Sequence, residues 1–129
     1  MKLITIIFIL LFSSFSFAQN TEYKEYFDNG TLKISGYKNS NGQKEEQWKE
    51  YYKSGKLQFI RFFKDGKLEG ERQQYYEDGK LRSIGNFKDG KAEGEYKRYY
   101  TSEKENAIEN YKNGELEGEF KFYHENGKL

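Results

Sequence analysis

Three pairs of glutamates are the most regular chemical groups in the sequence. Each pair is separated by one residue, and the pairs recur every 24 residues as Glu69/Glu71, Glu93/Glu95 and Glu117/Glu119. Glycosidases use two carboxyl groups as acid and base or nucleophile, and calcium sites also gather carboxylates. A catalytic centre brings unlike groups together once, whereas these are like groups at a constant interval. We therefore interpret the pairs as a solvated charged ladder, which the many Lys and Arg residues neutralise across strands.

Other reactive groups are scarce. The chain has no Cys, which excludes thiolate metal sites and cysteine nucleophiles, and its one histidine, His124, stands where a tyrosine stands in the neighbouring repeats. A formal net charge of +1 provides no basic excess for binding nucleic acid. The serines lie in no nucleophile motif. We expect no catalytic residue, metal or cofactor, and predict that the protein is not an enzyme.

A column of tyrosines is the better candidate for binding. Tyr75, Tyr99 and Tyr123 share the 24-residue interval, and such columns serve protein interfaces or stack on sugar rings. Packing between neighbouring strands is the structural alternative. Choline- and glucan-binding cell-wall repeats also use Tyr-Tyr hairpins, but they are shorter and rich in Trp, whereas Trp48 stands alone here. The predicted interaction surface comprises Tyr75, Tyr99, Tyr123, Glu71, Glu95 and Glu119.

These residues belong to an internal repeat of 24 residues. Tyr-Tyr pairs begin at 51, 75 and 99, and Tyr123-His124 follows at the same step. Copies cover about 26–50, 51–74, 75–98 and 99–122, with a fragment at 123–129. The predicted structural positions of the repeat are Gly55, Gly66, Gly70, Gly79, Gly90, Gly94, Gly114, Gly118, Gly127, Tyr52, Tyr76 and Tyr100.

Turn signals predict the elements that carry these positions. Asn-Gly, Asp-Gly and Ser-Gly dipeptides supply positive φ for tight hairpin turns, and from Gly55 they alternate at 11 and 13 residues. Strands of about seven to nine residues fit between them. No uninterrupted stretch is long enough to favour a helix. We predict an all-β protein of antiparallel hairpins that form an elongated, twisted, single-layer meander.

Period-two alternation assigns the two faces of each second strand. One face carries Leu68, Gly70 and Arg72 and their counterparts, and we expect it to be the core, lined also by Leu57, Phe59, Phe63, Leu81 and Phe87. The opposite face carries the glutamates. Glycine inside a strand often lets another group approach the backbone. We therefore expect rings to lie against the mid-strand glycines Gly70, Gly94 and Gly118.

The N-terminal segment predicts export. Residues 1–18 contain Lys2, an apolar run from Leu3 to Phe12 and small residues before a cut after Ala18, which is the layout of a secretory signal peptide. We expect it to be helical, with a short linker at 19–24 and a repeat domain at 25–129. The apolar run is about half of what crosses a bilayer, so an uncleaved anchor is the weaker alternative. The mature protein would be periplasmic or secreted.

The recurring G-K-x-x-G-E-x-x-x-Y-Y-x-x-G, from Gly66 to Gly79 and again from Gly90 to Glu103, resembles the MORN repeat (membrane occupation and recognition nexus). The 24-residue step and the Tyr-Tyr-x-x-Gly-Lys-Leu opening resemble its bacterial variant, found in YwqK-type antitoxins of toxin-antitoxin systems. The resemblance covers about residues 25–129. It implies β-hairpin repeats that contact proteins or lipids, without catalytic residues.

Three departures from the pattern carry expectations. Glu103 replaces the turn glycine of the other copies, so we expect a wider turn at 101–104. Extra residues at Lys38 to Gly42 make the first copy irregular. The sequence stops at Leu129 where a new strand should begin, and an open strand edge there would allow self-association or β-augmentation.

The residues and the resemblance together favour a protein-interaction scaffold. We expect an exported, non-enzymatic scaffold whose partner is another protein, a toxin if the protein is antitoxin-like. The alternative is an envelope module that binds carbohydrate or lipid head groups.

Overall fold

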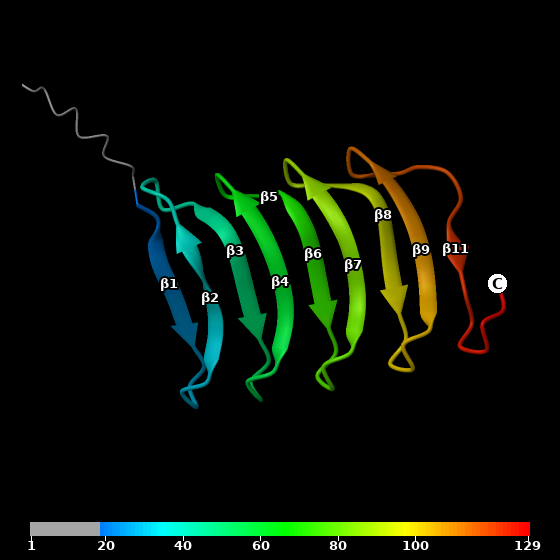
Figure 1. Ribbon diagram of the computed structural model, residues 1–129, viewed down its shortest axis with the longest axis horizontal. Helices are drawn as coiled ribbons and strands as arrows, with labels where there is room; N and C mark the ends of the chain where they lie inside the picture. Colours follow the sequence, from blue (N-terminus) through cyan, green and yellow to red (C-terminus); the bar gives the residue numbers. More distant parts are fainter. Residues whose placement is uncertain (1–18) are drawn as a thin grey trace, which may run out of the picture.

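The computed structural model describes residues 19–129, which form one antiparallel sheet and no helix (Figure 1). Its strands are β1 (Thr21–Tyr26), β2 (Leu32–Lys38), β3 (Lys44–Tyr51), β4 (Leu57–Lys64), β5 (Lys67–Leu68), β6 (Gly70–Tyr75), β7 (Leu81–Lys88), β8 (Lys91–Tyr99), β9 (Glu105–Lys112), β10 (Glu115–Leu116) and β11 (Lys121–Phe122). The expected signal-peptide helix lies outside the described residues. Within residues 19–129, no helix is long and apolar enough to cross a membrane.

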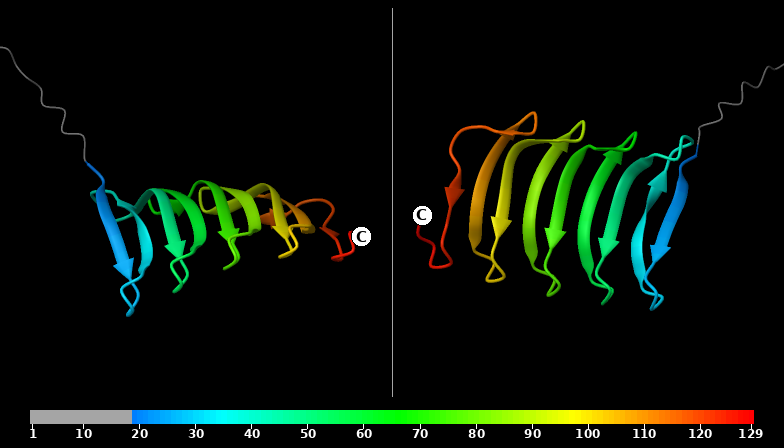
Figure 2. Two further views of the ribbon diagram at one scale, coloured as in Figure 1. Left: turned by 60° about the horizontal axis from the view of Figure 1, so that its bottom comes forward. Right: turned by 180° about the vertical axis from the view of Figure 1, so that it is seen from behind.

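The strands follow one another as a meander. Their order is β1-β2-β3-β4-β6-β7-β8-β9-β10, while β5 pairs with β4 and β11 pairs with β9. The hairpin turns form two rows along opposite edges of the sheet (Figure 1). Two further views show a single elongated layer that twists along its length (Figure 2). The predicted all-β meander is therefore confirmed.

One row of turns consists of two-residue turns. Asp65 and Gly66 both have positive φ, 49° and 80°, and Asp89-Gly90 and Asn113-Gly114 repeat this. Two consecutive positive φ angles define the type I′ turn, whose twist suits a hairpin. The first copy departs as expected: the N–H of Asn39 bonds the carbonyl of Gln43 at 2.9 Å around a longer loop.

The other row of turns is regular even where glycine is missing. The N–H of Tyr100 bonds the carbonyl of Lys104 at 2.9 Å, as that of Tyr76 bonds Lys80 at 2.8 Å. Glu103 has a φ of 66°, close to the 89° of Gly79. The expectation of a wider turn at 101–104 is wrong, because Glu103 adopts the left-handed conformation that glycine adopts in the other copies.

One face of the sheet contains the core. We call it the tryptophan face; it carries Trp48, Arg72 and Tyr96 at successive 24-residue steps. Among the described residues, Trp48 and Ala107 are the fully buried apolar side chains, at 1% exposure each. Ser83 and Glu109 are buried on the same face. This is the face predicted as core, although its last members, Leu116, Phe120 and Phe122, are exposed.

Trp48 shows how a single layer buries a large ring. Its indole lies directly over Gly36, 5.4 Å from the ring of Tyr23 and 6.2 Å from the ring of Phe63. Its Nε1 donates to the carbonyl of Tyr37 at 3.0 Å. The ammonium of Lys44 lies 4.5 Å from the indole. Neighbouring rings and one cation therefore cover the indole in place of a second layer.

The expectation about mid-strand glycines is wrong for Gly94 and Gly118, whereas a Cβ on Gly70 would lie 4.0 Å from the ring atom Cγ of Phe62. Gly70, Gly94 and Gly118 have φ of 107°, 79° and 78° and serve as left-handed positions at strand irregularities; a Cβ on Gly94 or Gly118 would meet open space. The covered glycines are Gly36, under Trp48, and Gly85, under Tyr96. Neither of these two glycines has a positive φ. They are required because a Cβ at either position would collide with the ring that lies over it.

Candidate interaction surfaces

The second tyrosine of each pair joins one repeat to the next. The hydroxyl of Tyr52 donates to the carbonyl of Tyr75 at 2.7 Å, and Tyr76 bonds Tyr99 in the same way at 2.8 Å. Tyr100 continues the series to Tyr123 at 2.9 Å. The repeated Tyr-Tyr pair thus supplies a donor from one copy and an acceptor from the following copy.

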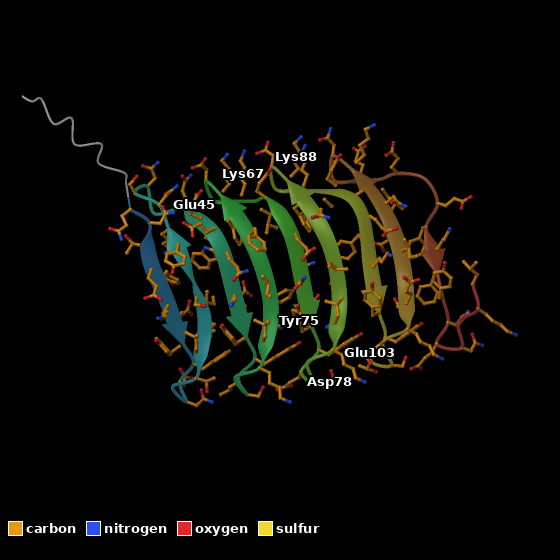
Figure 3. All side chains as sticks on the ribbon, viewed as in Figure 1. Glu45, Lys67, Tyr75, Asp78, Lys88 and Glu103 are labelled. Atoms are coloured by element: carbon orange, nitrogen blue, oxygen red, sulfur yellow. The ribbon has the colours of Figure 1, made fainter. Side chains whose placement is uncertain are left out.

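The first glutamates of two pairs, Glu69 and Glu93, also join repeats. The carboxylate of Glu69 accepts from the backbone N–H of Asp89 at 2.7 Å, and Glu93 accepts from Asn113 at 2.9 Å. Glu45, 24 residues before Glu69, accepts from Asp65 at 2.8 Å. Glu69 and Glu93 are accessible to solvent, as a charged ladder requires, but their carboxylates also satisfy turn donors, which the sequence pattern did not predict. Figure 3 shows Glu45 at the row of two-residue turns, opposite Asp78 and Glu103.

The second glutamates of the first two pairs, Glu71 and Glu95, lie on the side of the sheet opposite the tryptophan face. We call this side the isoleucine face; it carries Ile60, Ile84 and Ile108, all half-buried. Glu71 accepts a hydrogen bond from Gln73, which in turn accepts one from the hydroxyl of Tyr75. Burial, reinforced by the Glu71 carboxylate, raises the pKa of Tyr75. Tyr75 therefore stays protonated as a donor over a wide pH range.

In the next repeat an ion pair replaces that chain of hydrogen bonds. Lys97 lies 3.1 Å from the carboxylate of Glu95 and 3.7 Å from that of Glu105. The hydrogen bond to Glu95 is the main cause that raises the pKa of Lys97. Both acids and the lysine are accessible to solvent, so the pair orients side chains more than it stabilises the fold.

The structure brings three of the six predicted surface residues together. Glu71, Glu95 and Tyr99 line a shallow hollow of about 300 Å³ on the isoleucine face, with Ile84 and Lys97 between them. Tyr75 is connected to this hollow through Gln73 and Glu71. Glu119 is exposed in the stretch between β10 and β11, and Tyr123 follows β11 with its N–H bonded to Asn106 at 2.8 Å. Neither lines the hollow.

A larger hollow lies on the tryptophan face, where the sequence pattern had indicated only packing. It measures about 430 Å³ and is lined by side chains that include Tyr76, Arg82, Tyr96 and Arg98. The signal for it is a break in the repeat: Phe59 is followed 24 residues later by Ser83, so one aromatic ring is replaced by a small hydroxyl. This position differs from copy to copy, so the pattern shared by all copies does not contain the change.

Comparison with known protein families decides the affiliation. The model of the MORN repeat variant matches residues 19–39, 44–65, 68–89 and 116–129, which is more than half of the chain. The chain belongs to the MORN repeat variant family. A search of curated proteins finds no significant match.

The MORN repeat variant architecture also continues through the segment between the last two matched ranges. Residues 90–115 hold β8 and β9, which pair along their length, and the Tyr100 hydroxyl maintains the link to Tyr123. Within residues 19–129, no group of three or more His, Cys, Asp or Glu side chains is placed to hold a metal ion. The described repeats present two open faces, and a hollow lies over the middle strands on each of them.

Proposed function

We propose that this MORN repeat variant protein is an exported, non-catalytic scaffold that binds another protein through its isoleucine face. The observation that supports this proposal is the hollow where Ile84 and Tyr99 lie beside the Glu95–Lys97 pair. Protein interfaces combine an apolar or aromatic centre with a polar rim, and this arrangement provides both. The partner would insert an apolar side chain between Ile84 and Tyr99 and pair its own charges with Glu95 and Lys97.

A toxin is one partner of this kind, and the resemblance to YwqK-type antitoxins motivates that finer proposal. Because residues 1–18 have the layout of a signal peptide, such a toxin would be met outside the cytoplasm. The N-terminal residue of protein purified from its native host tests export. We expect a terminus at or near Gln19, and Met1 at the terminus would contradict export.

Site-specific crosslinking tests the scaffold. A photoreactive phenylalanine analogue at position 99 should capture one protein in the native host, and the purified pair should bind saturably. Tyr99→Ala and Glu95→Lys should each weaken that binding, whereas Phe122→Ala should leave it unchanged. Phe122 is a suitable control because it is an exposed aromatic that pairs with Ala107 on the tryptophan face.

The alternative, an envelope module that uses the same tyrosines on carbohydrate or lipid, predicts another result. Saturable binding of the protein to purified peptidoglycan or liposomes, lost in Tyr99→Ala and without any captured protein, would contradict the scaffold.

A further inference from the structure

All four arginines of the chain lie close together in the fold. They are Arg61, Arg72, Arg82 and Arg98, one on each of the successive strands β4, β6, β7 and β8. Apart from His124, every other basic residue is a lysine. A guanidinium differs from an ammonium in its planar fork of donors, which matches a carboxylate with two parallel hydrogen bonds. The middle of the sheet is therefore where planar anions are best recognised.

Only two of these arginines are paired with acids of the described chain. Arg61 lies 2.8 Å from Glu50, and Arg98 lies 3.1 Å from the buried Glu109. In residues 19–129, neither Arg72 nor Arg82 has a carboxylate within 4 Å; they lie instead by Phe59 and Tyr76, with guanidinium-to-ring distances of 5.1 Å and 5.4 Å. The cluster thus has an excess of positive charge.

A change of side-chain size opens space beside this charge. Where Phe59 lies under the guanidinium of Arg61 at 4.1 Å, the equivalent position in the next repeat is Ser83, which is 3% exposed. The hollow of about 430 Å³ lies over Ser83. The hollow is larger than a single carboxylate group. A ligand that fills it must therefore have a larger body attached to its acid group.

The rest of the lining is aromatic and polar. Tyr76, Tyr96, Tyr99 and Tyr100 line the hollow, and Gln74 and Asn106 supply amide donors and acceptors. Tyr96 is held in place, because its hydroxyl donates to the Ser83 hydroxyl at 3.1 Å and accepts from Arg72. The face of a tyrosine ring can stack on a pyranose ring, and a side-chain amide can hydrogen-bond a sugar hydroxyl. The guanidinium of Arg82, which has no carboxylate partner in residues 19–129, can bind the acid group of a ligand.

We propose that this hollow is a binding site for a carboxylated sugar, with a uronic acid as its simplest form. The Arg82 guanidinium binds the carboxylate, the tyrosines contact the ring, and Gln74 with Asn106 bonds the hydroxyls. A ring with several hydroxyls uses the whole lining, whereas an acidic peptide side chain would use Arg82 and leave the amides and tyrosines without partners. The hollow opens on the opposite face from the surface proposed above, and Tyr99 lines both. The variants below therefore change Arg82 and Ser83, which do not line the hollow on the isoleucine face.

Titration calorimetry of the purified protein with D-glucuronate tests the site, with D-glucose and a short glutamate-rich peptide as comparison ligands. We expect saturable binding of glucuronate at concentrations up to roughly 10 mM. Arg82→Gln should weaken it roughly tenfold or more, because a charge-assisted hydrogen bond is lost. Lys56→Gln is the control, because it removes an exposed positive charge directly before β4 and should not change the affinity for glucuronate.

Ser83→Phe gives a second, steric test, because Phe59 shows that the repeat accommodates this ring at the equivalent position. A folded Ser83→Phe protein, verified by circular dichroism, should lose glucuronate binding. Should that variant not fold, Arg82→Gln still decides. Absence of glucuronate binding, equally tight binding of glucose, or equal or tighter binding of the acidic peptide would overturn the proposal. Glucuronate binding that is unaffected by Arg82→Gln would overturn it too.

Discussion

The carboxylate of Glu69 accepts a 2.7 Å hydrogen bond from the backbone N–H of Asp89, 20 residues further along the chain. Next to it, the N–H of Gly90 bonds the carbonyl of Leu68 at 2.9 Å. Both donors of one type I′ turn are thus satisfied by the preceding repeat. The turns act as links between hairpins as well as reversals of the chain.

Glu69→Ala should therefore destabilise the protein although its side chain is exposed. We expect a loss of about 1 kcal/mol in the free energy of unfolding, because the hydrogen bond to a charged acceptor is partly screened by solvent. Urea denaturation measures the loss, and hydrogen exchange at the Asp89 amide should accelerate. Glu77→Ala, at an exposed turn position, is the control and should change neither. An unchanged exchange rate at Asp89 in Glu69→Ala would contradict the link.

Tyr76→Phe should also weaken the contact between repeats. It removes only the hydroxyl that donates to the Tyr99 carbonyl, so we expect a cost of about 1 kcal/mol with the ring packing unchanged. Tyr75→Phe is the matched control, since its hydroxyl bonds the side chain of Gln73 within the same strand. Thermal melting of both variants should show the larger decrease for Tyr76→Phe, and equal decreases would argue against the inter-repeat link.

Two glycines should respond to alanine for different reasons. A Cβ on Gly85 would collide with Cδ2 of Tyr96, so Gly85→Ala must displace the ring, and we expect a loss of about 2–3 kcal/mol in the free energy of unfolding. In Gly94→Ala the new Cβ meets open space, but the alanine must adopt a φ of 79°. We expect this to lower the free energy of unfolding by about 1 kcal/mol. The order of the two unfolding free energies, and a change in near-UV circular dichroism for Gly85→Ala alone, would establish the distinction. A milder effect at Gly85 than at Gly94 would refute it.

Glu103→Gly should stabilise the protein. Glu103 has a φ of 66° at a turn where the other copies place glycine, and a left-handed conformation costs a non-glycine residue about 1 kcal/mol, part of which the flexibility of glycine in the unfolded chain offsets. A net gain of about 0.5 kcal/mol should appear as a higher urea midpoint. Glu77→Gly, at a position without positive φ, should lower the midpoint instead, and a fall in both variants would contradict the strain at Glu103.

The Lys67–Asp89 pair predicts a response to acid. Lys67 lies 2.9 Å from the Asp89 carboxylate, and the hydrogen bond between them lowers the pKa of Asp89 below its ordinary 3.8. When folding lowers the pKa of an acid, the fold gains stability at every pH above the ordinary pKa of that acid. This gain disappears as the pH falls through the lowered pKa. Lys67→Gln should return the pKa of Asp89 towards 3.8 in an NMR titration, whereas Lys64→Gln, on an exposed side chain, should not.

The local order of the residues was enough to predict the repeat, the positions of the turns, the all-β meander and the face that holds the core. Each of these depends on interactions within a few residues: Asx-Gly dipeptides select hairpin turns, and side chains alternate along a strand. Trp48 and Tyr96 lie on the face that alternation assigned to the core.

Only the tertiary structure decided what individual members of a column do. Glu69, just before β6, and Glu71, within β6, have the same charge and are separated by one residue, yet a turn 20 residues away binds only Glu69. The rings lie over Gly36 and Gly85, and Ser83 opens a hollow where Phe59 fills one. These contacts join neighbouring hairpins, whose relative position depends on bulges and on the register between strands, and a 24-residue period carries no information about either.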